Sequence, residues 1–545
     1  MRHYSGWLIG LILMFANTAM STISVPLRGW CITHDDLPYL RRVIERAPEF
    51  NINMLQLAGE PERGGIVNHL NDILKNATRQ EKINTLIKLA HSKNIQVFIR
   101  LEEIVDIPHQ YFNDNLLNFD NPHLWKWLKA RYDSLFTRLP ELTGVVLSFE
   151  KSQVPLVRAA SVQSELTPPE RLATLINAIY QICKSHQRIL YVQDFSWRWS
   201  TVQAFQQALE WVPAEVHVLT KVTVFDFIQT YPQHPLIGQV KPHPQVIEFD
   251  LCGKYVGQAK IPWCSPDYLK TRWQEVLQDS GIVGGCGHID WYRNTVFDTP
   301  NEINLFAFST LLDNPNANMN DVWNDWVRKR FGEKAIYRVV PALKRTGPIA
   351  PMIFYVLGCY FISATSNIPS LAAALNTGRI EFDATVTAQW DERFKIIGEK
   401  LLNLNQTFVD TVMAEKQLAL EKIQQSISEL KEAKAMEMLQ DKDYDYLSHY
   451  LSMTMTCARI WNILTRAVFY LRLFQTYLQP VHQQEVRNAI NQLQILTGQL
   501  IQMYGADFRI IQSGQDSPTP TIPESLQLFI EDLKVELENT AEWLR

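Results

Sequence analysis

The feature that most constrains the fold is an alternation of short apolar runs with helical patterns between about Arg28 and Phe331. Strand–helix alternation repeated eight times predicts parallel strands that close into a (β/α)8 barrel. A doubly wound open sheet is the alternative, but no glycine-rich nucleotide fingerprint follows the first strand. The expected strands are LRGWCIT, INMLQLAGE, IQVFIRLEE, LTGVVLSFE, RILYVQDF, VHVLTKVTVFD, QVIEFDLCG and GIVGGCGHID. The helical stretches between them include LPYLRRVIERAPEF, RQEKINTLIKLAHSK, PHLWKWLKARYDSLFTRL and PPERLATLINAIYQICKSH.

The character of the chain changes after about residue 332, and no glycine lies between Gly398 and Gly498. Apolar residues at spacings of 3, 4 and 3 predict an amphipathic helix through Leu420, Ile423, Ile427 and Leu430. Three more long helical patterns follow it. We therefore expect an α/β barrel over residues 25–335 and an all-α C-terminal domain over residues 336–545. That domain would support the barrel, partly cover its active site, or form a homodimer.

The first 24 residues have the pattern of a secretory signal peptide. Arg2 and His3 precede the apolar run Gly6–Phe15, and small residues follow it. The run is shorter than the roughly 20 apolar residues that a membrane helix needs. We expect a secreted or periplasmic protein with no stable membrane span after signal cleavage; an uncleaved anchor is the alternative. The other long apolar stretch, residues 349–362, fits a buried helix better than a membrane span.

Composition narrows the functional class. A net charge of -5 over 545 residues argues against a dedicated nucleic-acid binder. The 7 cysteines are scattered and form no CxxC pair, so neither a zinc site nor a dense disulfide framework is indicated. We expect no metal and no cofactor. The 15 tryptophans fit a packed core, and they also suit a protein that stacks on sugar rings.

The ends of the expected strands carry the candidate chemistry, because a barrel places its active site at the carboxyl ends of its strands. Seven of the strands end in acidic residues. Helix capping explains one such residue more easily than seven, and clustered carboxylates suit an acid and a base with separated pKa values. The acidic residues are Glu60, Glu102, Glu103, Glu150, Asp194, Asp226, Asp250 and Asp290.

Alternation along QVIEFDLCGK indicates which side chains enter the barrel. Ile247 and Phe249 share one face and should meet the surrounding helices, whereas Glu248 and Asp250 should point inward. Glu248 lies deeper, where a paired structural charge is expected, and Asp250 lies nearer the mouth. Lys221 also enters the mouth, and a lysine there needs either an acidic partner or an anionic substrate.

Several of these stretches resemble the α-glucuronidases of glycoside hydrolase family 67. LTGVVLSFEKS is similar to the fourth strand of the family, which implies that Glu150 is the general acid. VLTKVTVFDFIQTYPQHPLIG is similar to the sixth strand and implies a uronate-contacting Lys221 and a catalytic Asp226. QVIEFDLCGKYVGQ and CSPDYLKTRWQEVLQDSGIVGGCGHIDW are similar to the seventh and eighth strand regions. The family has a second carboxylate on the seventh strand where this chain has Lys254.

The resemblance implies a glycoside hydrolase acting on a uronic-acid-containing oligosaccharide or polysaccharide. Glu150 would protonate the leaving oxygen and Asp226 would activate water with inversion, which requires carboxyl groups roughly 6.5–9.5 Å apart. The expected substrate contacts are Lys221, Lys254, Asp194, Arg198, Trp197, Asp250, Asp290, Trp291 and Tyr292. The alternative is a catalytically impaired carbohydrate-binding protein on a glycosidase barrel, which Lys254 supports. A third alternative is a helical interaction protein with the barrel as scaffold.

Overall fold

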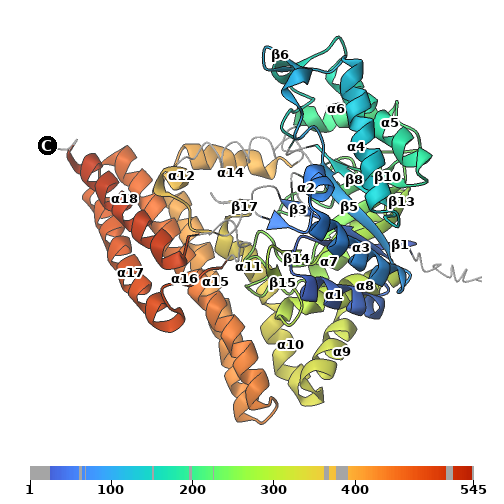
Figure 1. The fold of residues 1–545 in the computed structure, drawn as a ribbon. Helices are drawn as coiled ribbons and strands as arrows, with labels where there is room; N and C mark the ends of the chain where they lie inside the picture. The colour runs from blue at the N-terminus through green and yellow to red at the C-terminus, as the bar shows by residue number, and fades with distance from the viewer. Residues whose placement is uncertain are drawn as a thin grey trace, which may run out of the picture.

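The computed structural model describes residues 25–60, 64–67, 69–149, 152–194, 199–224, 226–360, 367–375, 391–510 and 520–542. Eight parallel strands close into a barrel in the spatial order β1-β13-β12-β11-β10-β8-β5-β2 (Figure 1). They are β1 (Leu27–Ile32), β2 (Met54–Leu57), β5 (Gln96–Glu102), β8 (Gly144–Ser148), β10 (Ile189–Gln193), β11 (His217–Lys221), β12 (Gln245–Asp250) and β13 (Ile282–His288). The predicted (β/α)8 barrel is confirmed, although the sixth strand ends at Lys221 and leaves Asp226 on the loop that follows.

Helices surround the barrel, and their starts follow from local capping. Asp36 and Asn121 each accept a hydrogen bond from a first-turn backbone N–H, and Thr167 forms a capping box with Glu170. The helices are α1 (Leu37–Arg46), α2 (Leu70–Lys75), α3 (Ala77–His91), α4 (Pro122–Arg138), α5 (Pro168–Ser185), α6 (Trp199–Leu209), α7 (Pro266–Val276) and α8 (Ile303–Asp313). Short pairings outside the barrel join β3 (Gly59–Glu60) to β4 (Gly64–Gly65), β6 (Phe112–Asn113) to β7 (Leu116–Asn118), β7 to β9 (Val162–Gln163), and β14 (Asp290–Trp291) to β15 (Asn294–Thr295).

The barrel interior changes from apolar to polar toward the carboxyl ends of the strands. Its apolar part is a separate cluster that includes Phe98, Val146, Tyr191, Leu219 and Val246. Two residues further along, the inward positions on these same five strands are held by Arg100, Ser148, Gln193, Lys221 and Glu248. The side chains of the barrel therefore form a polar floor beneath its mouth.

Side chains of β12 alternate between the outside and the inside of the barrel, as the sequence predicts. Ile247, Phe249 and Leu251 belong to the large cluster shared with the surrounding helices, whereas Val246 belongs to the inner cluster. Glu248 is completely buried and accepts a hydrogen bond from the Gln193 side chain. Its other carboxylate oxygen lies 3.4 Å from Nε2 of His288. Glu248 is thus the paired internal charge that the sequence predicts.

The C-terminal part of the chain is helical and lies beside the barrel, as the orange and red helices of Figure 1 show. On α15, Ile423 and Leu430 are buried, and Leu420 and Ile427 are partly buried against the core. One apolar cluster joins Cys264 and Ile303 to Leu430 and Leu447, so the helices pack directly on the barrel. They are α9 (Met319–Phe331), α10 (Ile336–Lys344), α11 (Thr346–Phe354), α12 (Leu371–Leu375), α14 (Arg393–Leu402), α15 (Gln406–Ala435), α16 (Asp441–Tyr477), α17 (Pro480–Tyr504) and α18 (Ile522–Glu542).

The described part of the apolar stretch, residues 349–360, differs from the single buried helix that we expected. The helix α11 ends at Phe354, and a hairpin of β16 (Tyr355–Val356) and β17 (Cys359–Tyr360) follows. Leu357 and Gly358 have φ angles of 50° and 81°, the positive values that a tight two-residue hairpin turn requires. Within the described part of the chain, no helix is long and apolar enough to span a bilayer.

Three further sequence predictions concern the cysteines, the signal peptide and the domain boundary. All 7 cysteines are buried free thiols in the structure. The predicted signal peptide, residues 1–24, lies outside the described residues. The domain boundary expected near residue 335 remains a prediction. Buried apolar residues from both sides of it belong to the same cluster.

Candidate active site at the mouth of the barrel

The predicted site residues that the structure describes lie at the carboxyl ends of neighbouring strands, and all of them are buried. They are Asp194, Lys221, Asp226, Asp250, Lys254, Asp290, Trp291 and Tyr292. Glu150, Trp197 and Arg198 lie outside the described residues. The geometry below therefore concerns the part of the mouth formed by β10, β11, β12 and β13.

Asp226 is the centre of this cluster and is only 2% exposed. Its Oδ1 accepts a hydrogen bond from Nζ of Lys221 at 2.7 Å, and its Oδ2 accepts one from Nζ of Lys254 at 3.1 Å. The hydroxyl of Tyr255 also donates to Oδ2. Burial alone would raise the pKa of Asp226, but Lys221 and Lys254 outweigh it and hold this pKa well below its usual range. Asp226 is thus an ionised carboxylate at neutral pH.

The two lysines lie in an aromatic setting. Nζ of Lys254 is 3.8 Å from the centroid of the Trp291 ring, and Nζ of Lys221 is 4.9 Å from that of Phe227. These contacts have the geometry of cation–π interactions, which stabilise a cation removed from water. Burial lowers the pKa of Lys221 to about 8, and Asp226 opposes this shift only in part. Lys221 is therefore charged at pH 7 and close to titration above it.

Asp250 orients the loop that carries Lys254. Its Oδ1 accepts the backbone N–H groups of Cys252 and Gly253, both at 2.9 Å, and its Oδ2 accepts that of Lys254 at 2.7 Å. Burial raises the pKa of Asp250 to about 6, although these donors oppose the shift. The carboxylate therefore folds the loop after β12 back over the mouth, and this places Lys254 against Asp226.

The helical part of the chain reaches the same loop. The hydroxyl of Tyr355 donates to Oε1 of Gln229 at 2.6 Å, and Nε2 of Gln229 donates to Oδ2 of Asp250 at 3.3 Å. Tyr355 lies in the hairpin after α11, 126 residues from Gln229. The C-terminal helices thus support the site through this chain of hydrogen bonds.

Asp290 closes the mouth on the side of β1. It is completely buried, and its Oδ1 accepts hydrogen bonds of 2.7 Å from both the backbone N–H and Oγ1 of Thr33. Burial raises its pKa to about 7. Trp291 and Tyr292, which follow it, have ring centroids 4.5 Å apart and are 3% and 4% exposed. Their predicted contact with substrate is not tested by this geometry.

Asp194 has a different environment at the end of β10. It is 3% exposed, and neither carboxylate oxygen accepts a hydrogen bond of ordinary geometry from another described residue. Nδ1 of His234 lies 3.6 Å from its Oδ2. Burial raises the pKa of Asp194 to about 8, against a smaller opposing effect of Thr220, and burial lowers that of His234 to about 3. Both side chains are therefore neutral at pH 7.

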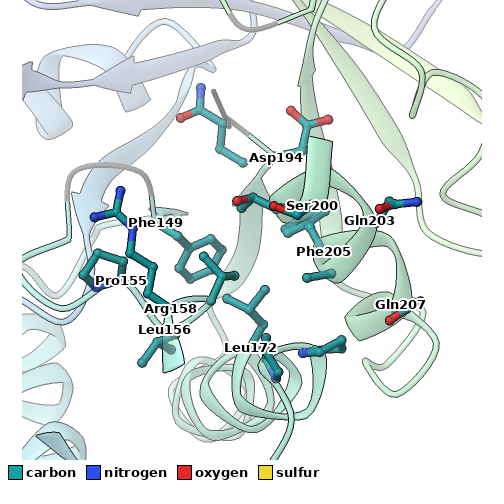
Figure 2. Close-up of a pocket in the computed structure, with 16 residues that line it drawn as sticks. Phe149, Pro155, Leu156, Arg158, Leu172, Asp194, Ser200, Gln203, Phe205 and Gln207 are labelled. Carbon is teal, nitrogen blue, oxygen red and sulfur yellow. The ribbon is translucent and has the colours of Figure 1, made fainter. Parts of the chain in front are cut away.

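A cavity of about 390 Å³ opens beside Asp194, between the loop after β8 and the helices α5 and α6. Figure 2 shows Asp194 at its upper edge, Phe149 and Arg158 on one side, and Gln203 and Gln207 on the other. No group of three or more His, Cys, Asp or Glu residues among the described ones is arranged to hold a metal ion. The site offers an ionised carboxylate, two ammonium groups and neutral acids at one rim.

Sequence reasoning missed Tyr255, His234, Gln229 and the lining of this cavity. Tyr255 is adjacent to the predicted Lys254, so its position on the loop was a usable signal. His234 and Gln229 lie on the irregular segment after β11, where periodicity carries no information. The cavity depends on how α5 and α6 pack, which no local pattern indicates.

No model of a known protein family matches this sequence, and no curated protein sequence matches it. A solved structure of a family 138 glycoside hydrolase targeting pectin rhamnogalacturonan II superposes with a TM-score of 0.62 at 13% identity, covering 95% of this chain and 68% of that chain. The Thermobaculum terrenum O-GlcNAc hydrolase, in a mutant form, gives a TM-score of 0.46 at 12% identity, covering 95% and 97%. The family 84 structure CpGH84B gives 0.45 at 11% identity, covering 94% and 77%. None of these descriptions names family 67, and at 13% identity the family 138 structure shows that the two chains share a fold.

Proposed function

We propose that this protein is a glycoside hydrolase that cleaves an oligosaccharide at the mouth of the barrel, with Glu150 and Asp226 as its two carboxylates. The observation that carries the proposal is the ionised Asp226, held by Lys221, Lys254 and Tyr255 just after β11. Carboxyl ends of barrel strands are where enzymes with this fold carry their chemistry. The resemblance of LTGVVLSFEKS and VLTKVTVFD to glycosidase strands supports both assignments.

The two carboxylates have different tasks in the proposed reaction. Glu150 protonates the glycosidic oxygen as the bond to the leaving group breaks. Asp226 stabilises positive charge on the sugar ring, orients water on the opposite face and takes its proton as the new C–O bond forms, so that the configuration inverts. A carboxylate has about four acceptor positions, and Asp226 uses one on Oδ1 and two on Oδ2. One position on Oδ1 is therefore left for the attacking water.

The lowered pKa of Asp226 limits how strongly it can act as a base. A base works best when its pKa lies near the operating pH, whereas Lys221 and Lys254 hold the pKa of Asp226 well below it. Asp226 therefore contributes mainly by orienting the water and by its negative charge. Because its pKa is lowered, Asp226 stays ionised at acidic pH, and its protonation does not limit the reaction there.

A second candidate is a carbohydrate-binding protein that no longer turns over its ligand. It is favoured by the ion pair between Lys254 and Asp226, since Lys254 stands where the resembling family has an acid. Both lysines pair with Asp226, and this pairing would compete with a sugar carboxylate for the same ammonium groups. The two candidates differ in one measurable respect, which is turnover.

The decisive experiment measures hydrolysis of uronic-acid-bearing and neutral oligosaccharides by the wild-type protein, Glu150→Gln and Asp226→Asn. Loss of either carboxylate should lower turnover by about a thousandfold, equivalent to roughly 4 kcal/mol of transition-state stabilisation. Asp532→Asn, a change at an exposed position on α18, is the matched control and should have no effect.

Aryl glycosides with an acidic phenol as leaving group separate the two roles. Such a leaving group needs little protonation, so Glu150→Gln should regain most of its activity on them, whereas Asp226→Asn should not. Turnover that neither substitution affects would refute the mechanism. Sugar binding by the wild-type protein without turnover would establish the second candidate.

A further inference from the structure

A second cavity, of about 760 Å³, lies where the barrel meets the C-terminal helices. The segments after β11 and β12 line it from the barrel, and α10, α11 and α15 line it from the helices. Its volume falls within the range of sites that hold a small organic molecule. It shares no lining residue with the cavity beside β10, so it is a separate candidate site.

Much of the wall of this second cavity is apolar. The apolar lining residues include Trp263, Tyr268, Pro341, Pro348, Pro351 and Met352. Tyr268 and Met352 are half-buried and supply an aromatic ring and a thioether to the wall. The Tyr268 ring packs against Trp263, with centroids 5.6 Å apart and planes inclined by 63°. Aromatic rings and methionine sulfur both make favourable contacts with aromatic groups, so this wall favours an aromatic ligand.

The charged side chains of the wall already have partners in the chain. Asp267 and Lys344 pair with each other at 3.1 Å. Arg345 pairs with Glu429 at 2.5 Å, and Glu415 pairs with the buried lysine that follows it at 3.1 Å. Asp267 also lies in the first turn of α7, where it offsets the partial positive charge of that helix end. Because these charges are compensated, an uncharged ligand fits the cavity better than an ion.

One polar group of the wall is left for a ligand. Ser265 lines the cavity directly before α7 and is 6% exposed. Its hydroxyl does not cap the helix, and among the described residues it has no hydrogen-bond partner. A hydroxyl can both donate and accept a hydrogen bond, so Ser265 can pair with a hydroxyl or carbonyl group of a ligand.

The position of the second cavity connects it to the mouth of the barrel. Gln229 is part of its wall and joins Tyr355 to Asp250 through the hydrogen bonds that support the mouth. A ligand that fills the cavity therefore lies next to the link between the C-terminal helices and the barrel.

We propose that this cavity binds a neutral aromatic molecule that carries one hydroxyl or carbonyl group. That group pairs with Ser265, and the aromatic ring lies against Tyr268 and Met352. The inference goes beyond the proposed glycosidase function and does not depend on it, because binding here is measured without turnover.

The test is a ligand-observed NMR titration of the full chain with 1-naphthol and 1-naphthoate at pH 6.5. The two probes share one ring system, and only naphthoate is charged at this pH. The wild-type protein should bind 1-naphthol about tenfold more tightly than 1-naphthoate, since the wall has no uncompensated cation for the carboxylate. Equal or tighter binding of 1-naphthoate, or no binding of 1-naphthol, would overturn the proposal.

Two methionines provide a matched pair of variants that locate the bound probe. Met352 on α11 and Met413 on α15 are both half-buried against the same apolar cluster, but only Met352 lines the cavity. Met352→Trp places a larger side chain in the cavity and should weaken 1-naphthol binding by about tenfold, whereas Met413→Trp should leave it unchanged. Equal effects of the two substitutions would contradict binding in this cavity.

Ser265→Ala tests the polar contact with little change in the size of the cavity. It should weaken 1-naphthol binding about fivefold, because a neutral hydrogen bond contributes about that factor. Binding of 1-methylnaphthalene, which has no polar group, should stay the same. An equal loss for both probes would contradict the contact with Ser265, and thermal unfolding of each variant verifies that it is folded.

Discussion

The acidic residues on the two sides of the barrel mouth are held in different ways. On the side of β12 and β13, Asp250 accepts three backbone N–H groups and Asp290 accepts a backbone N–H and a hydroxyl of Thr33. On the side of β10 and β11, Asp226 is held entirely by the side chains of Lys221, Lys254 and Tyr255. Asp194 on that side accepts no hydrogen bond of ordinary geometry from the described residues.

This difference separates structural from chemical roles. Backbone donors cannot leave a carboxylate without unfolding the loop to which they belong, so Asp250 and Asp290 hold loops in place. Side-chain donors can rotate toward a ligand, and a protonated carboxyl such as that of Asp194 can donate a hydrogen bond to a ligand. The β10–β11 side of the mouth is therefore where we expect substrate chemistry, and the following predictions test that division.

The largest effect on stability is expected from Asp226→Asn. It leaves the buried ammonium groups of Lys221 and Lys254 without a carboxylate, which should lower the free energy of unfolding by about 3–5 kcal/mol. Denaturant unfolding at pH 7 measures this, and adding Lys254→Met should recover part of the loss. A loss below about 1 kcal/mol would show that the ion pairs do not hold this side together.

A smaller effect, about 2–4 kcal/mol, is expected from Asp250→Ala, because three backbone N–H groups in a buried loop lose their acceptor. Asp250→Asn should cost roughly half as much, since one side-chain oxygen can still accept the N–H groups of Cys252 and Gly253. Equal losses for the alanine and asparagine variants would contradict the assignment of Asp250 as the anchor of the loop.

The smallest effect is the contribution of Asp194 to the pH dependence of stability. Its pKa is about 8 in the folded protein and roughly 3.9 in the unfolded chain. A raised pKa means tighter proton binding by the folded state, so this contribution is complete at low pH and is lost as the pH rises toward 8. Between pH 6 and pH 8, the wild-type protein should lose about 2 kcal/mol relative to Asp194→Asn.

Comparing the wild-type protein with Asp194→Asn isolates this titration from those of Asp250 and Asp290, whose pKa values of about 6 and 7 affect both proteins alike. Parallel pH profiles for the two proteins would mean that Asp194 is ionised in the folded state.

Much of the fold could be predicted, because strand and helix periodicity is a local property. The inward Glu248 and outward Phe249 of β12 follow from simple alternation, and the apolar stripe through Ile423 and Leu430 follows from helical spacing. The stretch 349–362 could not be read correctly, since an apolar run does not distinguish a helix from a helix followed by a hairpin. The turn at Leu357 and Gly358 makes that difference.

The sequence by itself determined the barrel, the adjoining helices and the concentration of acidic residues at one rim, because each follows from the order of residues along a strand or helix. Tertiary structure alone decided which of those acids are ionised. Lys254 reaches Asp226 across 28 residues, and Tyr355 reaches the loop through Gln229 across 126. The pKa of a buried carboxyl depends on the charges and donors that packing brings to it, and those partners are distant in sequence.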